Sequence, residues 1–270
     1  MRYHLQNVYM RWCGGSYNPP VHDYSKDYLT FEALEDTTFK FTRNALEYSV
    51  DDGSTWVELP ASTNTPTVAS GDKIMFKQVN PTIGSSYYGI GSFSSTGKFN
   101  VSGNIMSLLY GDDFDGQTSL SGKNNVFARL FYNCKNVISV SNLSLPATTL
   151  ANYCYYYMFD YCKNLTTAPE LPATTLANYC YFGMFSGCTN LTTAPELPAT
   201  KLGYHCYESM FYNCSKLNSI TCYATTNIRP FILENWVYGV SETGTFTRSS
   251  SSSWPSGVSG IPTGWSIIVQ

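Results

Sequence analysis

Apolar and polar residues alternate in short runs through residues 27–111, a pattern that predicts β-strands. The runs cover residues 28–34, 38–42, 46–50, 55–59, 73–77, 98–101 and 105–108. An Asp-Asp-Gly-Ser sequence at residues 51–54 joins the third run to the fourth and favours a hairpin. Six or seven short strands at this spacing predict a small, immunoglobulin-like β-sandwich.

The second half of the chain repeats itself with a period of 26 residues. Residues 159–184 and 185–210 are nearly identical, and related copies precede and follow them. Phenylalanines mark the units at Phe131, Phe159, Phe185 and Phe211, with steps of 28, 26 and 26 residues. A unit of this size cannot bury its apolar face alone, so the units are expected to stack on one another.

Each repeat is predicted to contain a short strand and a helix. The strand covers residues 165–168 and ends at Pro169, because proline cannot donate to a β-ladder. The helix covers residues 149–162, with Thr148 or Thr149 as N-cap and Asn164 as a left-handed stop. Its apolar stripe consists of Ala151, Cys154, Tyr155, Met158, Phe159 and Cys162.

The repeat unit resembles the BspA-like leucine-rich repeats. The matching positions are the strand leucine, the Leu-Pro exit, the aromatic residue at the end of the helix and the cysteine before the next strand: Leu165, Leu171, Pro172, Phe159 and Cys162, with Leu191, Leu197, Pro198, Phe185 and Cys188 in the next copy. Proteins of this kind are bacterial surface adhesins, and similar repeats occur in phages that infect gut bacteria. The resemblance covers about 110 residues and implies no catalytic residues.

The expected fold is therefore α+β, with an N-terminal β-sandwich followed by a short leucine-rich-repeat solenoid and a C-terminal cap. Residues 1–26 form an arm or linker and residues 27–111 the sandwich. Residues 112–222 form about four repeats. Residues 223–270 form the cap, in which several aromatic residues supply apolar side chains for packing.

Seven of the nine cysteines occupy repeat positions. Cys154 and Cys162 would lie roughly 12 Å apart on one helix, which is too far for a disulfide bond. Free buried cysteines behave as small apolar residues, so a ladder of thiols in the core is the favoured interpretation. Disulfides between stacked repeats and a metal site are the alternatives, although no CxxC motif is present.

Composition narrows the classes of function. Charged residues make up 13% of the chain, about half the usual share, and the net charge is −3. Lys and Arg do not cluster, so nucleic acid is not an expected partner. The 22 tyrosines suit either a recognition surface or a neutral β-rich protein. No stretch of 18 apolar residues and no signal-peptide core is present, so we expect no membrane insertion.

Candidate catalytic or metal-binding residues are few. Asp112, Asp113 and Asp115 form the densest acidic cluster, but the spacing does not match an EF-hand, which leaves a polar loop or a bound cation. Glu170 and Glu196 occupy equivalent exposed turns, and nothing in the sequence raises the pKa of one of them for glycoside hydrolysis. Residues 49–56 match the Asp-box of sialidases, a hairpin corner that lies away from the active site of those enzymes. We expect no cofactor and no metal.

The sequence offers more candidate residues for a binding surface than for a catalytic site. Residues opposite the apolar stripe change from repeat to repeat and include many aromatic residues, which is typical of a contact surface or of ordinary surface drift. The candidate ligand-binding residues are Arg129, Tyr132, Tyr156, Tyr157, Tyr161, Phe182, Glu208 and Tyr212.

The functional expectation is non-catalytic recognition. The chain is expected to be an adhesin or a phage receptor-binding or fibre component that contacts a bacterial surface glycan or protein, at a virion or cell surface. Residues 1–26 are expected to provide contacts within a virion or a homo-oligomer. A structural spacer without its own ligand is the alternative, and a carbohydrate-active enzyme is a third.

Overall fold

The computed structural model describes residues 22–78, 90 and 92–270. Most of the predicted N-terminal arm therefore lies outside the described residues. The strands lie before residue 145 and after residue 218, and the helical elements among the described residues are all short. The elements are η1 (Tyr24–Lys26), β1 (Leu29–Ala33), β2 (Phe39–Phe41), β3 (Leu46–Ser49), β4 (Val57–Leu59), β5 (Lys73–Gln78), β6 (Phe93–Ser95), β7 (Phe99–Asn104), α1 (Ser107–Tyr110), η2 (Gly111–Asp113), β8 (Val137–Ser144), β9 (Ser219–Cys222), β10 (Thr245–Arg248) and β11 (Ser266–Val269).

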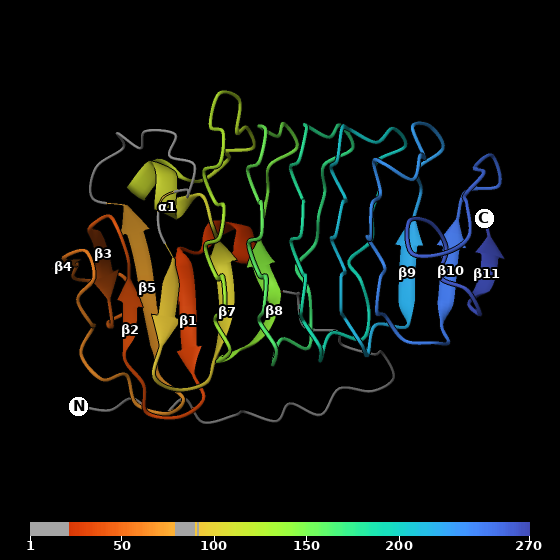
Figure 1. The fold of residues 1–270 in the computed structure, drawn as a ribbon. Coiled ribbons are helices and arrows are strands. Elements are labelled where there is room, and N and C mark those ends of the chain that lie inside the picture. The colour runs from red at the N-terminus through yellow and green to blue at the C-terminus, as the bar shows by residue number, and fades with distance from the viewer. Residues whose placement is uncertain (1–21, 79–89, 91) are drawn as a thin grey trace, which may run out of the picture.

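The N-terminal half contains two sheets (Figure 1). One has six strands in the order β4-β3-β5-β1-β7-β8, and the other pairs β2 with β6. Phenylalanine rings fill the space between them, and Phe31 lies 5.2 Å from Phe39 and 4.8 Å from Phe93, centroid to centroid. The predicted strands are present except the last, because residues 105–108 lead into α1 instead. Strand β6 was not predicted.

The Asp-box is a structural corner, as expected. Strands β3 and β4 form the hairpin, and Asp51 accepts hydrogen bonds from the backbone N–H and the hydroxyl of Thr55, at 2.9 and 2.7 Å. These bonds, together with one from Ser49, lower the pKa of Asp51 to about 2. The ring of Trp56 packs on Tyr28, at 4.8 Å between ring centroids, which ties the corner to the beginning of β1.

The helix predicted for residues 149–162 is wrong. The segment is a run of turns in which every fourth residue, namely Tyr153, Tyr157 and Tyr161, has a left-handed backbone with φ between 52° and 60°. A helix buries positions at i, i+4 and i+8, and turns with a four-residue period bury the same positions, so the apolar stripe does not distinguish the two. Asn164 is not left-handed, and its side-chain amide donates to the carbonyl of Lys135 instead.

These turn runs hold consecutive repeats together. Within a run, alternate N–H groups close local turns, and the others donate to the neighbouring repeat. The donors of one run are the N–H groups of Tyr153, Tyr155, Tyr157, Phe159 and Tyr161, and the acceptors are the carbonyls of Asn178, Cys180, Phe182, Met184 and Ser186. Runs before and after this one follow the same scheme. Buried backbone groups in the runs are thus paired without any helix.

Equivalent side chains stack on their own copies inside the repeats. Phe131, Phe159, Phe185 and Phe211 form one row, with ring centroids 5.2, 5.5 and 5.9 Å apart and planes within 7° of parallel. A second row runs from Phe127 through Tyr155, Tyr181 and Tyr207 to Trp236. Parallel rings at this separation add roughly 0.5–1.5 kcal/mol per pair to the free energy of burial.

The predicted ladder of cysteines is confirmed for the described residues. Eight cysteines from Cys134 to Cys222 are free and buried. The thiol of Cys188 donates to the carbonyl of Phe159 at 3.1 Å, and Cys162 and Cys214 make the equivalent bond. Burial raises the pKa of Cys134 and of Cys154 to about 12. Cys13 lies outside the described residues.

The predicted fold class is wrong as a whole. An α+β leucine-rich-repeat solenoid requires a helix in each unit and a continuous parallel sheet, whereas the structure has one four-residue α-helix and several separate sheets. Residues 165–168 and 191–194 contribute single bridges only, such as Ser139↔Thr167 and Thr193↔Ser219. The prolines after these segments remove backbone donors, so a longer ladder cannot form there. The predicted domain limits remain predictions.

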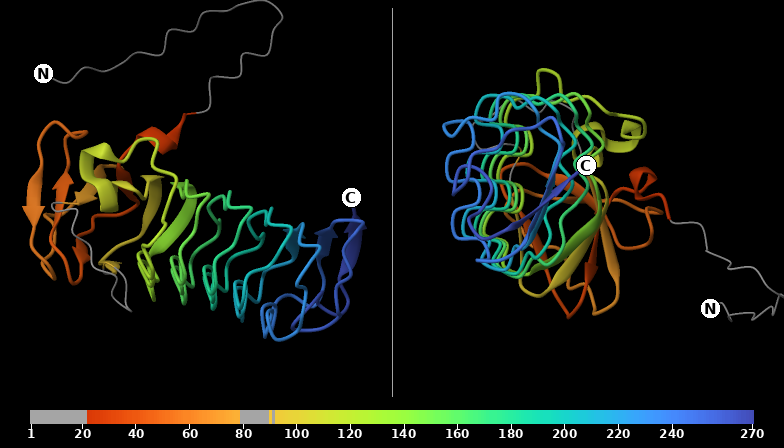
Figure 2. Two further views of the ribbon diagram at one scale, coloured as in Figure 1. Left: turned by 90° about the horizontal axis from the view of Figure 1, so that it is seen from above. Right: turned by 90° about the vertical axis from the view of Figure 1, so that its right-hand side faces the viewer.

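The C-terminal residues pack against the last repeat (Figure 2). Strands β9, β10 and β11 form a parallel sheet in the order β11-β10-β9. Trp236 is fully buried, donates its indole N–H to the carbonyl of Gly260 at 2.7 Å, and stacks on Trp254 at 5.3 Å. These contacts extend the inner aromatic row to the end of the chain.

Thiol reactivity tests this core. At pH 8 the thiolate fraction of a group with a pKa near 12 is on the order of 10⁻⁴, and only thiolates react with Ellman's reagent. We expect at most one thiol per native chain to react promptly, namely Cys13, and nine after unfolding in guanidinium. Prompt reaction of several thiols in the native protein would contradict the closed packing of the repeats.

Gly183 provides a second test. It has φ +59°, and a Cβ there would overlap the ring of Tyr157 in the preceding repeat. We expect Gly183→Ala to lower the free energy of unfolding by about 2–4 kcal/mol, from left-handed strain plus overpacking, in urea denaturation. Gly122→Ala is the matched control, because Gly122 has φ +72° and no atom within 4 Å of the added Cβ. A loss equal to that of the control would mean that the Tyr157 contact is absent.

Candidate functional site

The turn runs present one continuous surface, here called the turn face, made of residues 125–133, 152–161, 178–187, 204–213 and 231–239. All eight predicted ligand-binding residues lie on it, because the turn run occupies the part of each repeat that was predicted as helix. They do not form one cluster. The structure divides them among several groups of contacting side chains, which run along the direction in which the repeats stack.

The largest group is an aromatic cluster of five rings: Tyr153, Tyr156, Tyr157, Tyr179 and Phe182. Tyr153 stacks on Tyr179 with centroids 4.6 Å apart, and Tyr156 stacks on Phe182 at 5.1 Å. Tyr157 meets Tyr156 edge-on at 4.5 Å. All five side chains are half-buried. The ring faces are largely occupied by one another, so the cluster offers mainly ring edges and hydroxyl groups to a partner.

Glycines of one repeat accommodate tyrosines of the preceding one. The ring of Tyr157 lies against Gly183, and a Cβ at Gly187 would be 3.1 Å from Cδ1 of Tyr161. Both glycines are left-handed, with φ of 59° and 71°. The glycines therefore serve the turn geometry and also leave room for the tyrosines of the turn face.

Asp160 is a buried carboxyl within the turn face. Its side chain belongs to a residue only 4% exposed, and its Oδ1 has no hydrogen-bond partner among the described residues. Burial raises the pKa of Asp160 to about 7, opposed by a hydrogen bond from Ser186 and the positive charge of Arg129. The carboxyl is thus near its midpoint of ionisation at neutral pH.

Glu208, the predicted acidic contact, is not a free surface charge. It hydrogen-bonds the Nδ1 atom of His205, and this pair stands at the end of the aromatic cluster, where the imidazole stacks on Tyr179 at 5.1 Å. Burial raises the pKa of Glu208 against the opposing effect of His205, and the charge of Glu234 raises it further.

The remaining predicted residues form two exposed pairs and a cationic contact. Tyr132 and Tyr161 meet edge-on at 6.4 Å, while Tyr212 stacks on Tyr238 at 5.1 Å. The guanidinium of Arg129 lies 5.5 Å from the ring centre of Tyr132, within the range of a cation–π contact. It also lies 5.8 Å from the ring centre of Tyr157, so Arg129 connects the Tyr132 and Tyr161 pair with the aromatic cluster.

Several residues of the turn face were missed by the sequence analysis. Tyr153, Tyr179 and Tyr204 fall inside the segments predicted as helices but were not among the candidate residues. A usable signal was present, because Asn or Gly occupies several of the left-handed positions: Asn125, Asn133, Gly183, Gly187 and Asn213. These residue types are enriched in left-handed conformations, which a helix interior does not contain.

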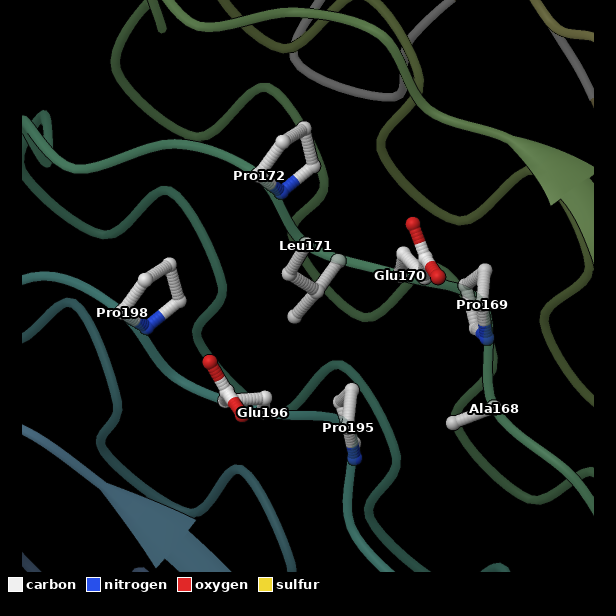
Figure 3. Close-up of a pocket in the computed structure, with 8 residues that line it drawn as sticks. All are labelled: Ala168, Pro169, Glu170, Leu171, Pro172, Pro195, Glu196 and Pro198. Atoms are coloured by element: carbon white, nitrogen blue, oxygen red, sulfur yellow. The ribbon is translucent and has the colours of Figure 1, made fainter.

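The opposite edge of the repeats carries an open pocket of about 440 Å³ (Figure 3). Glu170 and Glu196 line it together with Leu171 and the prolines of two consecutive Pro-Glu-Leu-Pro segments. Both glutamates are exposed. A general acid needs a site that shields it from water, so this arrangement does not favour the glycosidase mechanism.

The acidic cluster of Asp112, Asp113 and Asp115 is partly engaged in structure. Asp112 accepts hydrogen bonds from Nζ of Lys77 at 2.8 Å and from the hydroxyl of Tyr28 at 2.7 Å. These two contacts lower its pKa. Within the described part of the chain, no three His, Cys, Asp or Glu side chains are grouped closely enough to hold a metal ion.

Comparison with protein-family models, with curated proteins and with solved structures finds no match to this chain. The resemblance to BspA-like repeats therefore remains a resemblance in sequence. Among the described residues, no helix has the length and apolar character needed to cross a membrane.

The raised pKa of Asp160 predicts a pH dependence of stability. The folded state holds the proton up to about pH 7, whereas an unfolded aspartate loses it near pH 4. The contribution of Asp160 to the free energy of unfolding is therefore largest below pH 4. It falls between pH 4 and pH 7 and is constant above pH 7. We expect Asp160→Asn to remove this contribution and to raise the free energy of unfolding by about 1–3 kcal/mol at pH 8.

Urea denaturation at pH 4.5 and pH 8 measures this effect as the difference between the parent and the variant at each pH. Glu196→Gln is the control, because Glu196 is exposed. An Asp160→Asn variant that gains no more at pH 8 than at pH 4.5 would contradict the buried, proton-holding carboxyl.

Proposed function

We propose that this chain is a non-catalytic recognition protein, an adhesin or a phage receptor-binding or fibre component, which contacts a bacterial surface glycan or protein through the turn face. One observation carries the proposal. Among the described residues, the large aromatic side chains that are most exposed all lie on the turn face: Tyr132, Tyr161, Tyr204, Phe231 and Tyr238, each 42–49% exposed.

Exposed aromatic residues on one face suit binding rather than packing. Tyrosine and phenylalanine offer a large contact area for few rotatable bonds, so immobilising them costs little conformational entropy. The stacked neighbours of these rings, and the hydrogen bonds between turn runs beneath them, hold the surface in one shape before a partner arrives. A preorganised surface loses less free energy on binding than a mobile one.

A cell-binding experiment tests the proposal. The purified full chain is incubated with a panel of intact gut-bacterial cells, and the bound fraction is measured after pelleting. The test variant carries Tyr132, Tyr161, Tyr204 and Tyr238 changed to Ser, all of them exposed positions, and circular dichroism checks that it is folded. We expect the parent to bind at least one strain and the variant to lose most of that binding.

The matched control carries four exposed apolar residues from other surfaces changed to Ser: Leu34, Val50, Val57 and Ile268, which are 41–59% exposed. It should bind as the parent does. Equal loss in both variants would indicate non-specific adhesion through apolar surface. Absence of binding by the parent would contradict the proposal and favour the structural spacer, for which the stacked core suffices.

A further inference from the structure

We propose that a pocket between the N-terminal sheets and the first repeat binds an anionic group, a carboxylate or a phosphate, of the surface glycan that the turn face contacts. The pocket has a volume of about 560 Å³. Its lining residues are Thr42, Arg43, Ser62, Ser92, Arg129 and Tyr132. The inference rests on the proposed function and adds to it the chemical class of the ligand.

Hydrogen bonds between separate segments build the pocket wall. The N–H of Ser92, just before β6, donates to the hydroxyl of Thr42, just after β2, at 2.9 Å. The hydroxyl of Ser92 donates to the carbonyl of Arg129 in the first turn run at 2.7 Å. The N–H of Ser62 donates to the carbonyl of Phe41 at 2.7 Å. Four chain segments are thereby joined around one space.

Three lining residues have left-handed backbones: Arg43 with φ 79°, Ser62 with φ 63° and Arg129 with φ 60°. This conformation costs an L-residue about 1–2 kcal/mol relative to the right-handed one, and glycine avoids most of that cost. At Arg129 the turn run imposes the conformation, but the equivalent position is Gly183 two repeats later. Arg43 and Ser62 lie outside the turn runs, so no repeat geometry imposes the conformation on them, and backbone strain of this kind is typical of binding sites.

The charge at the pocket is opposite to that of the whole chain. The net charge is −3, and the described residues include four arginines, of which two line this one pocket. Among the described residues that line it, none is acidic. Asp160 stands near Arg129, but with a pKa of about 7 it offsets only part of the positive charge at neutral pH. The local field thus favours an anion.

The chemistry of the lining suits an acidic sugar. A guanidinium presents parallel N–H groups that match the two oxygens of a carboxylate or a phosphate. The hydroxyls of Ser62 and Thr42 are suited to hydrogen bonds with sugar hydroxyls. Tyr132, 42% exposed, offers a ring edge beside the guanidinium of Arg129. The pocket also adjoins the Tyr132 and Tyr161 pair, so one polymer chain could contact both.

Matched pairs of polymers provide the test. The carboxylate pair is polygalacturonate and its methyl ester, and the phosphate pair is poly(glycerol phosphate) and a neutral dextran. Binding of the full chain to each immobilised polymer is measured by biolayer interferometry at low and moderate salt. We expect the acidic member of one pair to bind at least about tenfold more tightly than its neutral partner. Preference within the first pair assigns a carboxylate, and preference within the second assigns a phosphodiester.

The variant Arg43→Gln with Arg129→Gln should lose this preference, and Arg43→Lys with Arg129→Lys should retain part of it, because lysine keeps the charge but not the bidentate geometry. The matched control, Arg229→Gln with Lys201→Gln, removes two positive charges elsewhere and should retain the full preference. Circular dichroism checks that each variant is folded. Equal losses in the control and the glutamine variant would overturn the proposal, because only net charge would then matter.

The outcomes separate this inference from the proposed function. Parent protein that binds cells but does not distinguish acidic from neutral polymers would overturn the anion pocket and leave turn-face recognition intact. Selective binding of an acidic polymer without binding to any cell panel would support the pocket and contradict the proposed cellular role.

Discussion

The structure of the repeats depends on one constraint, that every second N–H group of a turn run donates to a carbonyl of the next repeat. The donors and acceptors stay aligned only if the chain turns every four residues. A left-handed residue therefore recurs at that interval. Each side chain is then directly above its own equivalent in the next repeat. In the core, this register places aromatic rings on the equivalent rings of the next repeat and cysteine thiols against backbone carbonyls. Outside, it aligns variable residues into the rows that make the turn face.

The same register explains why inner and outer positions differ in how freely they vary. An inner residue contacts a copy of itself, so a change in one repeat leaves a gap or a clash in two neighbours, and the large-to-small cost for a buried aromatic residue is about 3–5 kcal/mol. Residues on the turn face are also constrained by the neighbouring repeat at some positions. Tyr157 and Tyr161 lie against Gly183 and Gly187, so at these two positions a glycine in one repeat makes room for a tyrosine of the preceding repeat. The distribution of tyrosines on this surface is therefore coupled from repeat to repeat.

Much of the architecture could be predicted from the sequence, and the failures have physical reasons. The alternation of apolar residues located six of the seven N-terminal strands, and the period located the buried Phe and Cys positions, because both signals report burial. Burial does not report backbone conformation, however, so a four-residue turn period was taken for the 3.6-residue period of a helix. Variation between repeats identified Tyr156, Tyr157 and Phe182, which do lie together. It could not find Arg43, because Arg43 is outside the repeats and reaches the pocket only through the packing of two segments 86 residues apart in sequence.

That packing gives the N-terminal sheets a role beyond closing one end of the repeats. Strand β8 of the repeat region joins β7 of the six-stranded sheet in parallel, and the N–H of Phe93 donates to the carbonyl of Leu130. The first turn run is therefore positioned by strands from residues 39–104 as well as by the next repeat. The turn face by itself contains only side chains of the repeats and of the segment that follows them. At the junction, Arg43, Ser62 and Ser92 add a positive charge and two hydroxyl groups from outside the repeats. The proposed contact along the turn face and the proposed anion selectivity at the junction therefore depend on two sets of residues that share only Arg129 and Tyr132.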